Sequence, residues 1–119
     1  MESILGSIKK LLGIAPDYKQ FDQDVIMHIN AVLMILTHLG VGPEEGFEIG
    51  EDYTETWEDF IGEGIKINGV KTFVYLKVRL LFDPPLSSAL IESIERQAKE
   101  YEWRIREQVE EFKNSQANE

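Results

Sequence analysis

Hydrophobic residues near the start of the chain recur every three or four positions, which is the spacing of one face of an amphipathic helix. The pattern predicts a short helix over residues 3–12, with Lys9 and Lys10 in its last turn, where cations favour the helix dipole. Gly13 follows at the position where a left-handed residue commonly ends a helix. The residues of the apolar stripe are Ile4, Leu5, Ile8, Leu11 and Leu12.

A second helix is predicted from Asp22 to about Leu39. Asp22 is a residue type that caps helix N-termini, and Phe21 and Ile26 stand at the two positions of a hydrophobic staple. Residues 25–39 carry no formal charge, so little of this helix suits contact with water. We therefore expect the helix to be buried on more than one side and to offer a surface to a second partner.

The most apolar stretch is residues 72–85, TFVYLKVRLLFDPP, in which Pro84 and Pro85 end any regular element. Alternate residues are apolar, as in a strand, and apolar residues also recur at helical spacing. The β-branched and aromatic content favours a strand, whereas the length from residue 65 to residue 82 favours a helix. In either form the element is too apolar to be solvated and is expected at the centre of the fold.

The last predicted helix runs from Ala89 to about Phe112, with Ser87 and Ser88 available as caps. Several Glu residues precede Lys or Arg by four positions, which supports an exposed helix by roughly 0.2–0.5 kcal/mol a pair. Residues 114–119 are polar and are expected to form a frayed tail. The apolar stripe of this helix consists of Ile91, Ile94, Ala98, Tyr101, Ile105, Val109 and Phe112.

Residues 44–64 are acidic and rich in glycine, which indicates a long loop between the second helix and the central element. Within it, residues 47–49 fit a short strand, and Thr54 or Thr56 fits the cap of a single helical turn that begins near Trp57. Loops of this length in compact domains are usually functional or mobile. The predicted fold class is therefore mainly α, a small bundle of about four helices with a long acidic loop.

Composition and charge narrow the possible functions. The chain has 119 residues, and we expect residues 1–119 to form a single helical domain. A net charge of −10 argues against nucleic-acid binding, because neutralising phosphates requires clustered Lys and Arg. The charges are also separated along the chain: residues 44–63 include acids and no base, whereas residues 64–82 include bases and no acid. The longest uncharged apolar run, residues 25–41, is too polar and too short for a bilayer span, so we expect a soluble protein.

The sequence contains no pattern that indicates catalysis. With no cysteine, thiolate chemistry and disulfides are excluded. His28 and His38 lie ten residues apart on one predicted helix, too far to share a metal ion, and the acidic loop lacks the spacing of a calcium-binding EF-hand. Ser87 has no general base indicated nearby and suits a capping role better than a nucleophilic one. We therefore expect no catalytic, cofactor-binding or metal-binding residue and no enzymatic activity.

Short motifs along nearly the whole chain resemble, in the same order, the phage head–tail connector proteins. These are the head-completion adaptors of tailed phages and prophages of Gram-positive bacteria. The segment LKVRLLFDPP is the most specific of the motifs. The resemblance implies that residues 64–82 are helical and that the protein is a structural virion protein and not an enzyme. The motifs are LGSIKKLLGI (residues 5–14), FDQDVIMHIN (21–30), LGVGP (39–43), TWEDF (56–60), VYLKVRLLFDPPLSS (74–88) and EWR (102–104).

The resemblance also implies a homo-oligomeric ring beneath the portal, joining the DNA-filled head to the tail. Its partners would be other copies of itself, the portal protein and a downstream connector or tail protein. DNA would pass through without specific binding, no membrane would be involved, and the virion protein would be made in the host cytoplasm. The alternative is a cytoplasmic helical adaptor or regulatory protein that binds one protein partner through its uncharged second helix.

A ring subunit needs two different, complementary surfaces, and the acidic loop and basic central element are candidates for such a pair. A negatively charged ring would also repel passing DNA. The residues expected at protein interfaces are Trp57, Phe60, Lys77, Arg79, Asp83, Trp103 and Arg104.

Overall fold

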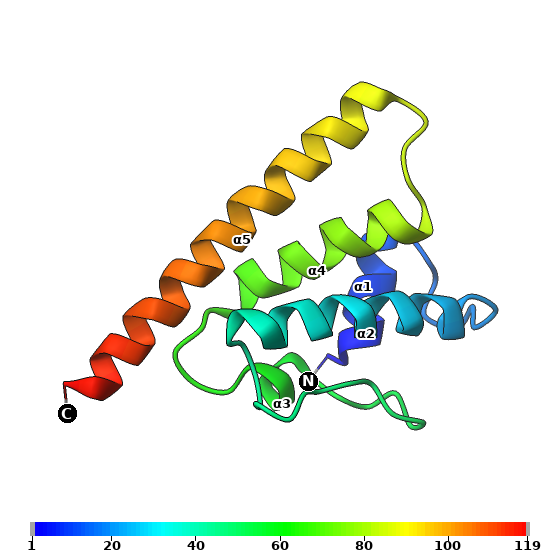
Figure 1. The fold of residues 1–119 in the computed structure, drawn as a ribbon. Helices are drawn as coiled ribbons and strands as arrows, with labels where there is room; N and C mark the ends of the chain where they lie inside the picture. Colours follow the sequence, from blue (N-terminus) through cyan, green and yellow to red (C-terminus); the bar gives the residue numbers. More distant parts are fainter. Residues whose placement is uncertain (1, 119) are drawn as a thin grey trace.

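The computed structural model describes residues 2–118, and within this range the chain forms five helices and no β-strand (Figure 1). The mainly α fold class is confirmed, with four longer helices and one short helix in the acidic loop. The only β-type pairing in the described range is an isolated bridge between Ser3 and Thr56. The helices are α1 (Ile4–Leu12), α2 (Asp22–Leu39), α3 (Trp57–Ile61), α4 (Ile67–Phe82) and α5 (Ser88–Ala117).

Helix α4 is the element around which the others pack. It contacts all four other helices and lies between α2 and α5 in Figure 1. Its buried positions are spread over more than one face, because different neighbours cover different sides. This explains why the sequence of α4 shows both alternation and helical spacing, and the helix implied by the family resemblance is confirmed. The buried residues of α4 are Val70, Phe73, Val74, Leu76 and Val78.

The predicted C-terminal end of α1 is confirmed, and its N-terminus lies one residue later than predicted, at Ile4. Ser3 caps its N-terminus by accepting a hydrogen bond from the Gly6 N–H at 2.9 Å, and Gly13 adopts a left-handed φ of +81° after its last turn. Lys9 and Lys10 lie in that last turn. Lys9 is buried, however, at 3% exposure, whereas Lys10 is exposed.

The start of α2 differs from the prediction. Phe21 occupies the N-cap position without a side-chain capping bond, and Asp22 is the first helical residue. The Asp22 carboxylate lies 2.8 Å from the ammonium of Lys9, so it forms a buried ion pair with α1. Asp22 as the N-cap is therefore wrong, because its carboxylate turns toward Lys9 instead of the helix's own N–H groups.

The loop between α2 and α4 has a few specific anchors. Thr56 caps α3 in a capping box with Asp59, so the predicted single turn is confirmed. The strand considered for residues 47–49 is absent. Instead, the amide of Asn30 on α2 accepts from the Ile49 N–H at 2.8 Å and donates to the Ile49 carbonyl at 3.5 Å. The Asn30 side chain thus pairs with the backbone N–H and carbonyl of Ile49, which in a sheet would pair with a neighbouring strand.

Helix α5 is longer than predicted. Ser87 accepts from the Leu90 N–H at 3.4 Å as its N-cap, and the helix continues through Ala117. The helix end predicted near Phe112 is therefore wrong, whereas fraying of residues 114–119 stays a prediction, and residue 119 lies outside the described range. The predicted stripe is confirmed, with Ile94, Ala98, Ile105 and Val109 buried and Ile91, Tyr101 and Phe112 half-buried.

Candidate interaction surfaces

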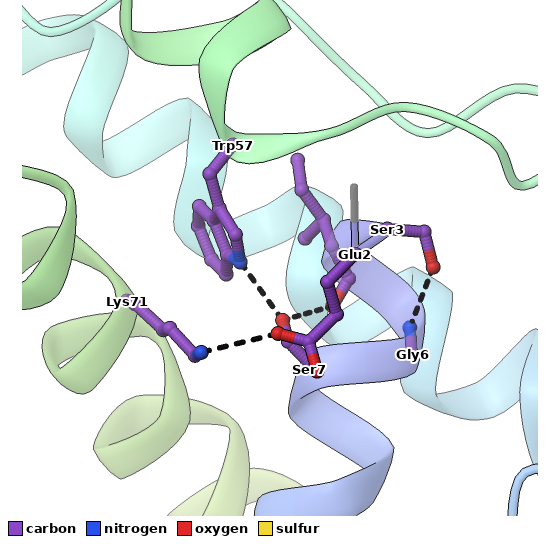
Figure 2. Close-up of polar contacts among 7 residues, drawn as sticks. Glu2, Ser3, Gly6, Ser7, Trp57 and Lys71 are labelled. Carbon is purple, nitrogen blue, oxygen red and sulfur yellow. Dashed lines mark hydrogen bonds and ion pairs between the residues drawn. The ribbon is translucent and has the colours of Figure 1, made fainter.

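Trp57, an interface candidate from the sequence, lies in the interior at 3% exposure. Its indole N–H donates to the Ser7 hydroxyl at 2.8 Å, and that hydroxyl donates to the Ile4 carbonyl at 2.9 Å (Figure 2). Figure 2 also shows Lys71 of α4 paired with Glu2 at 3.3 Å beside this network. Trp57 therefore anchors the acidic loop to α1, and its side chain has almost no surface to offer a partner.

Phe60 is also interior, at 1% exposure. Its ring packs against Phe47 with 5.2 Å between ring centroids. It also fills the space beside Gly42, where an added Cβ would lie 2.5 Å from the ring. Together with Trp57, Phe60 fixes α3 and the two arms of the loop to the core. The interface proposal consequently rests on the other five candidate residues.

Lys77 and Arg79 project from α4 and are both half-buried. Lys77 lines a small cavity of about 100 Å³ between α4 and α5, together with Glu95 and Glu102. Arg79 donates to the Tyr75 hydroxyl at 3.3 Å. Both side chains therefore face groups of their own subunit as well as solvent.

Within residues 2–118, the acids of the loop form no ion pair with the bases of α4. In the described range, the only ion pair of an α4 base joins Lys71 to Glu2, and none involves residues 44–63. Asp59 and Glu55 accept hydrogen bonds from the Thr56 and Gly50 N–H groups within the loop, whereas the other acidic side chains of the loop are exposed and available to groups outside the subunit.

The turn between α4 and α5 is exposed and apolar. Asp83 follows the last residue of α4, and its N–H donates to the Arg79 carbonyl at 2.9 Å. Three leucines project into solvent around it: Leu81 is 54% exposed, Leu86 is fully exposed and Leu90 is 55% exposed. This corner of the molecule combines the exposed Asp83 carboxylate with unusually exposed apolar side chains.

Trp103 and Arg104, both interface candidates from the sequence, lie on α5. Trp103 is 57% exposed and lies on the side of the helix opposite its buried stripe. Arg104 donates to Glu100 at 2.9 Å, one turn earlier, and its side chain is 62% exposed. A tryptophan whose side chain is largely exposed in the single subunit is a typical anchor of a protein interface.

The outward face of α2 carries exposed methionines. Met27 and Met34 are 60% and 59% exposed, although the opposite face of the helix is fully buried. Met34 and His38 form one wall of an open hollow of about 580 Å³, and residues 44–48 form the other. The second helix was expected to be buried on more than one side, but within the subunit one side is buried and the other presents an uncharged, exposed surface.

The histidines and acids do not form a metal site in the described residues. Within residues 2–118, no group of three or more His, Cys, Asp or Glu side chains is placed to hold a metal ion. His28 packs against Phe82 with ring centroids 6.4 Å apart, and His38 lines the hollow. None of the helices in the described range has the length and hydrophobicity needed to cross a membrane.

A family model described as phage connector protein matches residues 4–111, which is most of the chain. The chain belongs to this family, so the predicted resemblance to phage head–tail connectors is confirmed. Membership implies a structural virion protein that interacts with other phage head or tail proteins. No match was found among the curated proteins or the solved structures.

Proposed function

We propose that this protein is a head-completion adaptor that forms a ring beneath the portal and joins the DNA-filled head to the tail. The observation that carries the proposal is the match to the phage connector family over residues 4–111. Within this role the protein acts as a structural part and not as an enzyme, made in the host cytoplasm and incorporated at the head–tail interface.

The surfaces of the subunit support this role. A ring subunit contacts a neighbour on each side, and it also meets the portal above and a tail-side protein below. The exposed surfaces around Met34, around Asp83 and around Trp103 lie on different elements of the fold. A net charge of −10 suits a channel through which DNA passes without binding, because carboxylates repel phosphates.

The experiment is a deletion of the gene in the phage or prophage, followed by electron microscopy of the particles. We expect filled heads and free tails that do not join. Addition of the purified protein to these heads and tails should restore complete particles, and addition of a heat-unfolded sample should not. Normal virions in the absence of the gene would refute the proposal and favour the alternative, an adaptor that binds one partner through α2.

A further inference from the structure

The leucine corner, residues 80–91 at the turn between α4 and α5, presents apolar side chains to solvent (Figure 1). Leu86 is fully exposed, and Leu81 and Leu90 beside it are each more than half exposed. Pro84 and Pro85 restrict the backbone that carries Leu86, so little conformational entropy is lost when a partner covers this side chain. A cluster of exposed leucines on a restricted turn is typical of a protein-interaction surface.

The exposed face of α1 and the segment after it form an open hollow of about 640 Å³. Its apolar lining comes from Ile14, Ala15 and Pro16. Gly6 and Gly13 also line the hollow without adding a side chain, and a Cβ added at Gly13 would meet nothing within 4 Å. The volume falls within the roughly 300–1,000 Å³ of pockets that enclose a compact ligand group, so the hollow has room for a leucine side chain and part of the turn that carries it.

One free charge lies at each of the two surfaces. The leucine corner carries a single formal charge, the exposed Asp83, and the hollow is lined by the exposed Lys10. Neither side chain forms an ion pair among residues 2–118. A free acid beside the leucines therefore matches a free base beside the hollow, in a chain whose net charge of −10 otherwise keeps copies apart.

The flanking charges are mixed in sign. Arg79 and Glu92 flank the leucine corner, one at each end. At the hollow, Glu2 is paired with Lys71 at 3.3 Å, and Asp17 follows the last lining residue. A contact between the two surfaces is therefore stabilised mainly by apolar burial, and the pair of free charges contributes its orientation.

Leu86 does not fill the hollow of its own chain, because it is fully exposed. We propose that Leu86 of one subunit inserts into the hollow beside Ile14 of the next, with Asp83 facing Lys10. Each copy then uses its leucine corner toward one neighbour and its hollow toward the other, and such a head-to-tail contact can close into a ring. The contact rests on the ring of the proposed function and specifies how neighbours join.

Leu86→Ala should weaken self-association about tenfold or more, because it removes the side chain that fills the hollow. Light scattering over a series of protein concentrations measures this change. Leu11→Ala is the matched control, since Leu11 is 45% exposed on α1 but does not line the hollow, and it should leave association unchanged. Equal association of wild type and Leu86→Ala, or equal weakening by the two variants, would overturn the proposal.

Cross-linking locates the contact while Leu86, Asp83 and Lys10 stay in place. Ser88 is exposed two residues after Leu86, and Ala15 is exposed in the lining of the hollow. Because the chain has no cysteine of its own, Ser88→Cys and Ala15→Cys are made as separate full-length proteins, mixed and treated with a short bismaleimide cross-linker. We expect cross-linked heterodimers, and adding Leu86→Ala to the Ser88→Cys protein should remove most of them.

Matched control variants carry cysteines at exposed residues of the same types elsewhere. Ala31 is exposed on α2, and Ser115 is exposed near the end of α5. Ser88→Cys mixed with Ala31→Cys, and Ala15→Cys mixed with Ser115→Cys, should each yield little product. Equal cross-linking in the control mixtures would show random collision and overturn the proposal.

The outcomes separate this contact from the proposed function. Cross-linking of Ser88→Cys with itself would indicate a symmetric contact between two leucine corners and overturn the head-to-tail assignment. A heterodimer that forms equally well with Leu86→Ala would also overturn it. If wild-type rings form and restore head–tail joining while the Ser88–Ala15 mixture stays uncrosslinked, the contact is wrong and the function stands. If the protein stays monomeric and gives no cross-link, the contact is overturned, and the deletion experiment then decides the function.

Discussion

The ammonium nitrogen of Lys9 lies 2.8 Å from a carboxylate oxygen of Asp22, and both side chains are less than one-tenth exposed. The same nitrogen donates to the Tyr18 carbonyl at 2.7 Å and to the Pro16 carbonyl at 3.2 Å. One buried cation thus joins the end of α1, the connecting turn and the start of α2. A buried charge with this set of partners is costly to disrupt, because removing one member leaves the others without compensation.

Lys9→Met is therefore expected to destabilise the protein by roughly 3–5 kcal/mol, since it leaves a buried carboxylate and two carbonyls without their donor. Urea unfolding measures the loss. Lys10→Met is the matched control, because Lys10 is the exposed neighbour in the same turn and should change stability by less than about 0.5 kcal/mol. Equal effects of the two substitutions would show that the pair and its carbonyl partners contribute no specific stability.

Ser7→Ala is expected to cost roughly 1–3 kcal/mol, because the Trp57 indole N–H would remain buried without an acceptor. Trp57→Phe should also destabilise the monomer, and a double-mutant cycle should show that the two residues are coupled. Trp103→Phe is the control, since that ring is 57% exposed and its replacement should leave the monomer's stability nearly unchanged. If the Trp57→Phe protein has normal stability and weakened self-association, Trp57 lies at an interface between subunits instead.

Gly64→Ala should destabilise the fold through two effects. Gly64 has a φ of +89°, and an added Cβ would collide with the Phe112 ring of α5. Holding an alanine in the left-handed backbone conformation lowers the free energy of unfolding by about 1–2 kcal/mol, and the collision with the ring lowers it by about 1–3 kcal/mol more. Gly46→Ala measures the backbone effect alone, because Gly46 has a φ of +100° and open space around it. If thermal unfolding shows equal losses for both variants, Phe112 does not pack on the loop as described.

Replacement of both Pro84 and Pro85 by alanine tests the turn between α4 and α5. Proline reduces the conformational entropy of the unfolded chain, so each replacement is expected to lower the free energy of unfolding by roughly 0.4–1 kcal/mol. Helical content by circular dichroism should stay the same or rise, since α4 is then free to extend. We also expect lost or misassembled rings, measured by light scattering.

Leu86→Ala is the control for the double proline variant, because Leu86 lies in the same turn and is fully exposed. It should leave stability and helical content unchanged. Normal assembly and stability of the proline variant would show that the turn does not organise the two helices.

Local sequence determined where most helices begin and end. Ser3, Gly13, Thr56 and Ser87 each occupy the terminal position that their residue type predicts. These positions can be predicted from the sequence because a capping residue forms hydrogen bonds with backbone groups only a few residues away. The apolar stripe of α5 is readable for the same reason, since helical periodicity is a local property.

The tertiary structure decided which of several plausible roles each remaining residue takes. Lys9 and Lys10 are identical neighbours in sequence, yet only Lys9 is covered, because Asp22 and the turn after α1 fold over it. Trp57 has one charged neighbour, Glu58, and Trp103 has two, Glu102 and Arg104, and neither local pattern shows which tryptophan is buried. Ser7, fifty residues away, supplies the acceptor for the buried Trp57 indole, whereas Trp103 is 57% exposed on the side of α5 opposite its buried stripe. Burial depends on which distant segments come together, and that information lies in the packing of the whole chain.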